Sequence, residues 1–187
     1  QGLLWDCYIV VATIPAVVVG LGLKDHIEYL FTSSLLVCCM LAVTGIMMIM
    51  TRHLHERKVR LNSGRAMLIG CAQAGAIIPG ISRSGATIFM GMLLGLNREQ
   101  VARFSFILSV PAILGAAVLN LGEVVVDPPP PAELLSIAAG TIAAMLTGYL
   151  AIILLLDIIR RNRLPIFGYY CLSVSALTLF ALLFISG

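Results

Sequence analysis

Long apolar runs separated by short polar segments dominate the chain. Five of these runs have a length suited to crossing a bilayer, about 4–23, 34–50, 104–126, 133–159 and 165–185. A transmembrane helix needs about 17 to 25 predominantly apolar residues. The pattern therefore predicts an all-α integral membrane protein with about five full transmembrane helices.

Two further apolar segments, about 65–78 and 87–96, are each too short to cross a membrane alone. The junction between them reads Pro79-Gly80-Ile81-Ser82-Arg83-Ser84-Gly85-Ala86-Thr87. A continuous helix facing lipid does not tolerate so many helix-breaking residues together. We therefore predict a re-entrant helical hairpin over about 65–96.

The basic residues support this topology. They cluster in the loops at 52–65, 98–103 and 160–163, and the positive-inside rule places such loops in the cytoplasm. A hairpin returns the chain to its starting side and keeps all three clusters together, whereas a full crossing would leave the last cluster outside. The other side receives 24–33 and the loop around Asp127, which are neutral to acidic. We expect one polytopic domain over 1–187.

The overall composition excludes a soluble domain. Of the 187 residues, 60% are hydrophobic and 11% are charged, with a mean hydropathy of +1.04, so membrane lipids are the expected surroundings. A net charge of +3 does not indicate a nucleic-acid partner. The five cysteines lie in apolar stretches without zinc-site spacing. The histidines, His26, His53 and His55, lie in polar loops, where we expect them to be solvated.

Arg83 is the candidate for binding chemistry. An arginine at membrane depth costs about 2.5 to 3.5 kcal/mol on insertion scales and requires an anionic partner. Asp6 lies inside one predicted span near its end, and Asp157 lies at the boundary of another, so no tight internal partner is obvious. A bound anion is therefore favoured, and a structural ion pair stays open as the alternative.

The neighbours of Arg83 suit an anion site. Gly80 and Gly85 let backbone N–H groups approach a ligand, and Ser82 and Ser84 add hydroxyl donors. We expect Thr87 to cap the helix that follows, and a helix N-terminus favours phosphate. The alternative is that the tip only lets two short helices turn and pack.

At these residues the chain resembles a known family. The run 79–87 is similar to the second signature of the BacA-type (UppP-type) undecaprenyl-diphosphate phosphatases, also called bacitracin-resistance proteins. Further segments share the resemblance, namely 14–20, 67–74, 95–99, 102–106 and 110–116. It extends over essentially the whole chain.

The resemblance implies an enzyme that hydrolyses undecaprenyl diphosphate to the monophosphate. Such enzymes recycle the lipid carrier of cell-wall synthesis, at the outer face of the bacterial plasma membrane, and confer bacitracin resistance. The resemblance implies catalytic roles for Arg83 and Ser82. It also implies that Gly80, Ser84, Gly85 and Thr87 bind the substrate.

One part of the family pattern has no counterpart here. The first signature, rich in glutamates and followed by a Ser-Ser-Thr-Gly-His run, does not occur, so the chain resembles about the C-terminal two-thirds of the family domain. By the resemblance, the remaining third holds the catalytic glutamates and histidine. It would also hold the ligands of a divalent cation, Mg²⁺ or Ca²⁺, and we expect no metal ligands in this chain. A start at Gln1 inside an apolar segment suits a fragment.

The family is built from two inverted repeats, each with a re-entrant pair, and this chain shows one complete repeat. A lone tip would expose its polar backbone to lipid, so we expect the missing segment or another chain, as in a homo-oligomer, to cover it. Two other functions stay open. One is a transporter or flippase for a phosphorylated lipid or small anion, because broken helices also form transporter sites. The other is a non-catalytic membrane scaffold.

Overall fold

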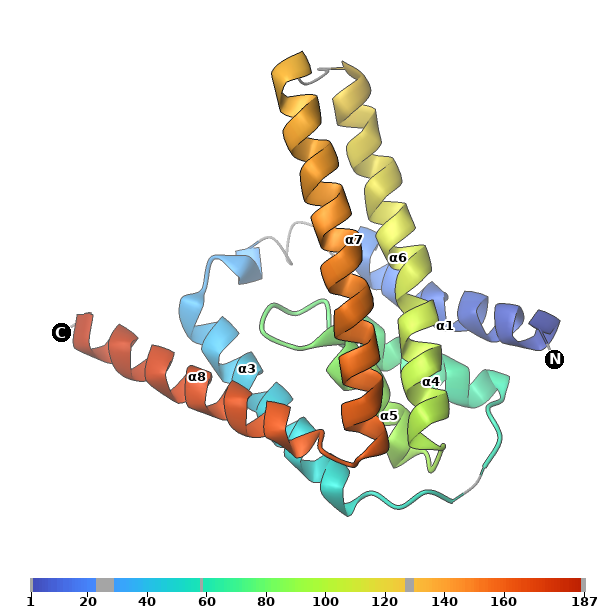
Figure 1. The fold of residues 1–187 in the computed structure, drawn as a ribbon. Coiled ribbons are helices and arrows are strands. Elements are labelled where there is room, and N and C mark those ends of the chain that lie inside the picture. The colour runs from blue at the N-terminus through green and yellow to red at the C-terminus, as the bar shows by residue number, and fades with distance from the viewer. Residues whose placement is uncertain (1, 23–28, 58, 127–129, 186–187) are drawn as a thin grey trace.

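The computed structural model is all-α over the residues that it describes, which are 2–22, 29–57, 59–126 and 130–185. Within these ranges the side chains of 2, 3, 116, 119–126, 131–134 and 185 are not described. The helices are α1 Gly2–Gly22, α3 Ser34–Met50, α4 Ser63–Gly75, α5 Arg83–Leu93, α6 Arg98–Val126, α7 Pro131–Arg160 and α8 Pro165–Ile185, with a 3-10 turn η1 at Thr51–His53 (Figure 1). The predicted fold class is confirmed.

Among the described residues, four segments are long and apolar enough to cross a membrane. They are Leu4–Gly22, Ser34–His53, Leu135–Arg160 and Pro165–Phe184. The remaining predicted span, 104–126, lies within α6, whose 29 residues would extend about 43 Å at the usual helical rise. That length exceeds the bilayer core, which is about 30 Å thick. All five predicted spans are therefore present as helices of sufficient length.

The two short helices predicted for the re-entrant hairpin are present as α4 and α5, and their re-entrant course in the membrane stays a prediction. α4 has 13 residues and α5 has 11, so they extend about 20 Å and 16 Å and neither crosses a bilayer. The two helices pack on each other and are joined by residues 76–82. α4 begins where the Asn62 Oδ1 accepts the Arg65 N–H at 2.9 Å. α5 ends at Leu93, and Gly95, two residues later, has a φ of +81° that permits a Schellman turn in which the Leu96 N–H donates to the Gly91 carbonyl.

The longer helices pack around this hairpin in pairs. α1 packs chiefly on α4, while α3 lies along α8, and the antiparallel α6–α7 pair projects away from the rest (Figure 1). In the α3–α8 pair, Gly45 and Gly168 lie against each other, since a Cβ at Gly168 would come within 2.6 Å of the Gly45 carbonyl oxygen. The buried Ser175 hydroxyl donates to the Cys38 carbonyl at 2.7 Å and joins the same two helices. Small residues thus let the two helix backbones approach closely. In lipid, such close packing and hydrogen bonding hold helices together, because the hydrophobic effect does not.

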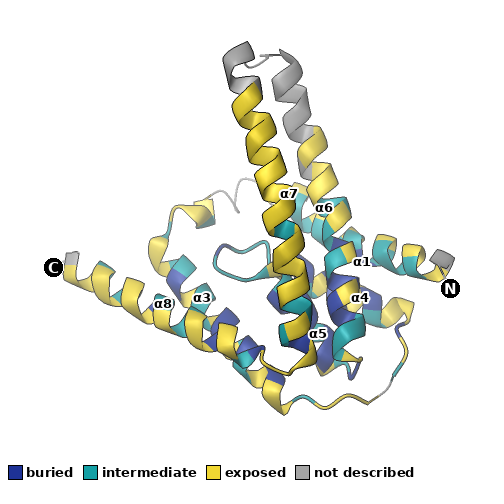
Figure 2. Cartoon of the chain, in the orientation of Figure 1, coloured by how far each residue is buried: buried dark blue, intermediate teal, exposed yellow. Residues whose placement is uncertain are grey.

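The buried residues gather at α4, α5 and the parts of other helices that touch them. Figure 2 shows that α7 is exposed along nearly all of its described length, whereas α8 is exposed on much of its surface but buries residues such as Gly168 and Ser175 against α3. The largest fully buried apolar side chains include Phe104, Ile69, Leu96 and Leu108. A helix that is apolar on all sides suits contact with lipid or with further protein.

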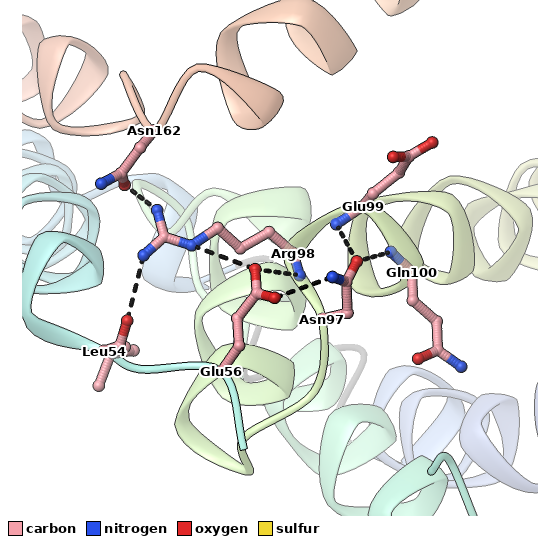
Figure 3. A network of polar contacts seen from close by, with 7 residues as sticks. All are labelled: Leu54, Glu56, Asn97, Arg98, Glu99, Gln100 and Asn162. Carbon is pink, nitrogen blue, oxygen red and sulfur yellow. Dashed lines mark hydrogen bonds and ion pairs between the residues drawn. The ribbon is translucent and has the colours of Figure 1, made fainter. Parts of the chain in front are cut away.

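The three basic segments meet on one side, as the charge pattern predicted. Figure 3 shows Arg98 at the centre of this region. Its side chain donates to the Leu54 carbonyl at 3.1 Å and to the Asn162 Oδ1, and it forms an ion pair with Glu56 at 3.6 Å. Asn97 caps α6 by accepting the Glu99 and Gln100 N–H groups. The segments that precede α4, α6 and α8 are therefore held together.

Glu99 adds a second link in this region. One of its carboxylate oxygens accepts from Arg103 at 2.6 Å and from Arg160 at 2.7 Å. The hydrogen bonds from Arg160 and then Arg103 hold the pKa of Glu99 below its ordinary value. The loops predicted for the opposite side fall largely on 23–28 and 127–129, which lie outside the described residues.

Candidate anion site at the hairpin tip

The tip of the hairpin is anchored to α3 by Thr44. Its buried hydroxyl lies 3.0 Å from the Gly80 carbonyl, to which it donates, and accepts the Ser82 N–H at 3.0 Å. Gly80 has a φ of +95°, which residues with a Cβ rarely adopt. A Cβ there would also collide with the Val37 carbonyl oxygen on α3. In the structure Gly80 therefore serves the close packing of the tip on α3, and its predicted contact with a ligand stays a prediction.

Ser82 is the N-cap of α5. Its Oγ accepts the Gly85 N–H at 3.1 Å, and its carbonyl accepts the Ala86 N–H at 2.8 Å. Gly85 is buried beneath this cap, since a Cβ on it would lie 3.0 Å from the Ser82 Oγ. Ser82 and Gly85 thus shape the first turn of α5, and their predicted roles toward a substrate stay predictions.

The prediction that Thr87 caps this helix is wrong. The cap is Ser82, because its extended backbone directly precedes the first helical residue, whereas Thr87 lies inside the helix. The Thr87 hydroxyl is within 3.0 Å of the Arg83 carbonyl and 2.5 Å from the Ser105 Oγ. It is buried and ties α5 to α6.

Arg83 is the first residue of α5, and its side chain is exposed. Within the described parts of the chain, no carboxylate lies within 4.0 Å of its guanidinium group. Asp157, which was one of the two candidate partners, instead pairs with Arg161 at 2.7 Å. The described residues therefore give the alternative of a structural ion pair no support.

A cavity of about 250 Å³ lies beside Arg83. It is lined by Arg83, Ser84, Ser105, Phe106 and Ser109. The lining offers a guanidinium group and three hydroxyls, and it contains no carboxylate or imidazole. Such a set of donors without a negative charge suits an anion rather than a cation.

Sequence reasoning missed Ser105 and Ser109, which α6 contributes to this cavity. They are four residues apart in the sequence, a spacing that places both hydroxyls on one face of a helix and that the sequence already shows. The pattern alone did not show which helix faces the tip. The contact between Thr87 and Ser105 provides that information.

The described residues do not fit a resident divalent cation. They contain no group of three or more His, Cys, Asp or Glu side chains placed to hold a metal ion. His53 and His55 are exposed in the basic loop, as expected, and His26 lies outside the described residues. The cation implied by the resemblance stays a prediction, with ligands that these residues do not supply.

Comparison with known proteins decides the family. The family described as bacitracin resistance protein BacA matches residues 2–177. The chain belongs to the BacA family. This confirms the resemblance predicted from the sequence, both at the run 79–87 and over nearly the full chain.

Several curated BacA relatives are named undecaprenyl-diphosphatase. The protein of Methanothermobacter thermautotrophicus is 42% identical over 184 residues, which cover 94% of this chain and 99% of the relative. That of Methanobrevibacter smithii is 41% identical over 175 residues, covering 90% and 61% respectively. That of Desulforapulum autotrophicum is 42% identical over 186 residues, covering 92% and 63%. The chain thus spans under two-thirds of two of these relatives and nearly all of the other.

Proposed function

We propose that this BacA-family protein hydrolyses undecaprenyl diphosphate, or a similar polyprenyl diphosphate, to the monophosphate. The observation that carries the proposal is the exposed Arg83 guanidinium at the start of α5, beside a cavity that offers three serine hydroxyls and no negative charge. Relatives about 40% identical bear the name undecaprenyl-diphosphatase, which supports the same reaction.

The start of α5 is suited to a diphosphate. Arginine presents a planar fork that matches two phosphate oxygens at once. The N–H groups of the first helical turn point in the same direction, and the helix dipole adds about half a positive charge. Ser82 uses its hydroxyl to accept the Gly85 N–H, so the Arg83 and Ser84 N–H groups are the ones left for a ligand. Donors placed in this way stabilise the charge that develops on a phosphoryl group during transfer.

We place the site on the outer side of the plasma membrane. α4 begins and α5 ends near the basic segments that contact Arg98, so the tip at 76–82 points away from the cytoplasmic side. The tip lies at membrane depth, where the low dielectric strengthens contacts between Arg83 and an anion. A lipid substrate reaches such a depth from within the bilayer.

The general base lies outside the lining of this cavity in the proposed mechanism. None of the five lining residues is Asp, Glu or His, so this chain contributes anion recognition, and another segment or a second copy contributes proton abstraction. We expect the ligands of the predicted Mg²⁺ or Ca²⁺ ion to come from the same segment or second copy that supplies the base. Ser84 orients the diphosphate against Arg83 within the cavity, while Ser105 holds the α6 wall in place through its contact with Thr87.

A transporter or flippase for a phosphorylated lipid is the second candidate. It is favoured by the same lining, which binds an anion without supplying an acid or a base. A flippase moves the intact diphosphate lipid across the membrane, whereas a phosphatase releases inorganic phosphate. Measuring phosphate release therefore separates the two functions.

The test compares Arg83→Ala with the matched control Arg103→Ala. Arg103 is exposed, pairs with Glu99 and does not line the cavity. Phosphate release from undecaprenyl diphosphate is measured in detergent, and membrane insertion is measured by the amount of protein in the membrane fraction. We expect Arg83→Ala to lower the rate by about a hundredfold or more with normal insertion, and Arg103→Ala to retain the rate.

Two other outcomes would contradict the proposal. If Arg83→Ala lowered the amount of inserted protein but left the rate per molecule unchanged, Arg83 would be structural, as in a scaffold. If the unsubstituted protein bound the lipid through Arg83 without releasing phosphate, the transporter would be favoured.

A further inference from the structure

A second hollow, of about 380 Å³, lies beside the Arg83 cavity and shares Ser84 with it. Helices α3, α5, α7 and α8 form its walls. Its polar end is the hairpin tip, where the hydroxyl-bearing residues Thr44, Ser82 and Ser84 contact one another, and the remaining lining is mainly apolar, with Leu154 and Phe167 among its members. We call this hollow the α7–α8 groove. Its volume falls in the range of about 300 to 1,000 Å³ that is usual for ligand pockets.

We propose that the α7–α8 groove binds the first isoprene units of the substrate's polyprenyl chain. The inference rests on the proposed function and deepens it. A polyprenyl chain is bonded directly to the diphosphate, so its first carbons must lie close to the phosphate held by Arg83. Ser84 lines both hollows and therefore lies where the polar head ends and the hydrocarbon chain begins.

The shape and lining favour a lipid chain over other occupants. Leu154 on α7 is 61% exposed and Tyr170 on α8 is 67% exposed, so the groove opens sideways toward the membrane. A long chain can leave through this opening while its first units remain against Ile88 and Phe167. The combination of a polar end and an apolar trough matches a molecule with a charged head and a hydrocarbon tail. A packed helix of another protein would not require the polar end.

The proposal predicts a chain-length effect that can be measured directly. Ala151 on α7 lines the groove, and Ala151→Trp would fill it. Ala138→Trp is the matched control, because Ala138 is exposed on the same helix and does not line the groove. Hydrolysis is compared for undecaprenyl diphosphate and for isopentenyl diphosphate, which carries a single isoprene unit.

We expect Ala151→Trp to lower kcat/KM for undecaprenyl diphosphate by about tenfold and to change kcat/KM for isopentenyl diphosphate by less than about twofold. Ala138→Trp should change neither value by more than about twofold. An equal loss for both substrates, or no loss for either, would overturn the proposal. Ala151→Trp could instead weaken self-association while the ratio of kcat/KM for the two substrates stays unchanged. That result would also overturn the proposal and identify the groove as an interface between copies.

Binding measured by native mass spectrometry separates this inference from the proposed function. If the unsubstituted protein hydrolysed neither substrate, the proposed function would fail. Weaker undecaprenyl diphosphate binding in Ala151→Trp than in Ala138→Trp would then still support the groove, and equal binding would overturn it. A membrane phospholipid retained by the protein and not displaced by undecaprenyl diphosphate would overturn it as well.

Discussion

Thr87 and Ser105 join α5 to α6 through their hydroxyl groups, which lie 2.5 Å apart in a buried contact. Thr87 is 1% exposed and Ser105 is 5% exposed, so water does not compete for this hydrogen bond. The contact holds the α6 wall of the anion cavity against the helix that begins with Arg83. The positions of Arg83 and Ser109 relative to each other thus depend on this pair.

Ser105→Ala should weaken the anion site without unfolding the protein. Thr87 keeps carbonyl acceptors on Arg83 and Ser84, so the loss of stability should be about 1 kcal/mol. The rate of phosphate release should fall several-fold, because the cavity loses a hydroxyl and the α6 wall can shift. Ser173→Ala, at an exposed position on α8, is the control and should retain the rate. Equal rates in both variants would remove Ser105 from the site.

Thr44→Val should loosen the hairpin tip. The substitution keeps the side-chain volume but removes both the donor to the Gly80 carbonyl and the acceptor of the Ser82 N–H. Leaving these partly buried groups unpaired should reduce the free energy of unfolding by about 1 kcal/mol and raise KM for the diphosphate. Thermal unfolding in detergent and steady-state kinetics measure the two effects. Thr178→Val, whose exposed hydroxyl only donates to Val174 on its own helix, should do neither.

Arg83→Lys should lose most of the activity while keeping the charge. Lysine offers a point charge and lacks the planar fork that engages two phosphate oxygens. We expect phosphate release to fall by at least about tenfold, measured beside Arg83→Ala at equal amounts of inserted protein. A rate near that of the unsubstituted protein would mean that Arg83 supplies only charge compensation.

The ion pairs of Glu99 should stabilise the protein in a pH-dependent way. Hydrogen bonds from Arg160 and Arg103 hold the pKa of Glu99 below its ordinary 4.5 in the folded protein. A lowered folded pKa means that the stabilisation is present above pH 4.5 and is lost as the pH falls through the folded pKa. The effect should be small because the side chain is solvated.

The measurement for Glu99 is the unfolding temperature of the unsubstituted protein and of Glu99→Gln, taken from neutral pH to below pH 4.5. We expect the unsubstituted protein to be slightly more stable at neutral pH and the difference to disappear in acid. A difference that stayed constant with pH would show that the carboxylate charge contributes nothing.

Several features of the fold were predictable because the bilayer imposes them locally. The second and last predicted spans, 34–50 and 165–185, match α3 and α8 at both ends. The hairpin followed from two short apolar segments around Pro79 and Gly80, since no continuous helix could include them. The meeting of the basic segments followed from the positive-inside rule and is seen in the contacts of Arg98.

The wrong prediction for Thr87 has a local cause. Both Ser82 and Thr87 are good capping residues, and the apolar run that begins near Thr87 suggested the later start. The helix begins at Arg83 because the Ser82 N–H is held by Thr44, which fixes the extended backbone that a cap requires. A contact with another helix therefore decided the boundary.

The sequence by itself determined the helical membrane fold, the re-entrant hairpin and the position of Arg83 at its tip. Each follows from lengths and residue types along a short stretch of chain, because lipid accepts only helices whose backbone is satisfied. Only the tertiary structure decided that Thr44 anchors the tip, that Ser105 and Ser109 line the anion cavity, and that α7 and α8 form the adjoining groove. Thr44 lies 36 residues from Gly80 and Ser105 lies 18 residues from Thr87, so these contacts depend on how the helices pack, which local patterns do not specify.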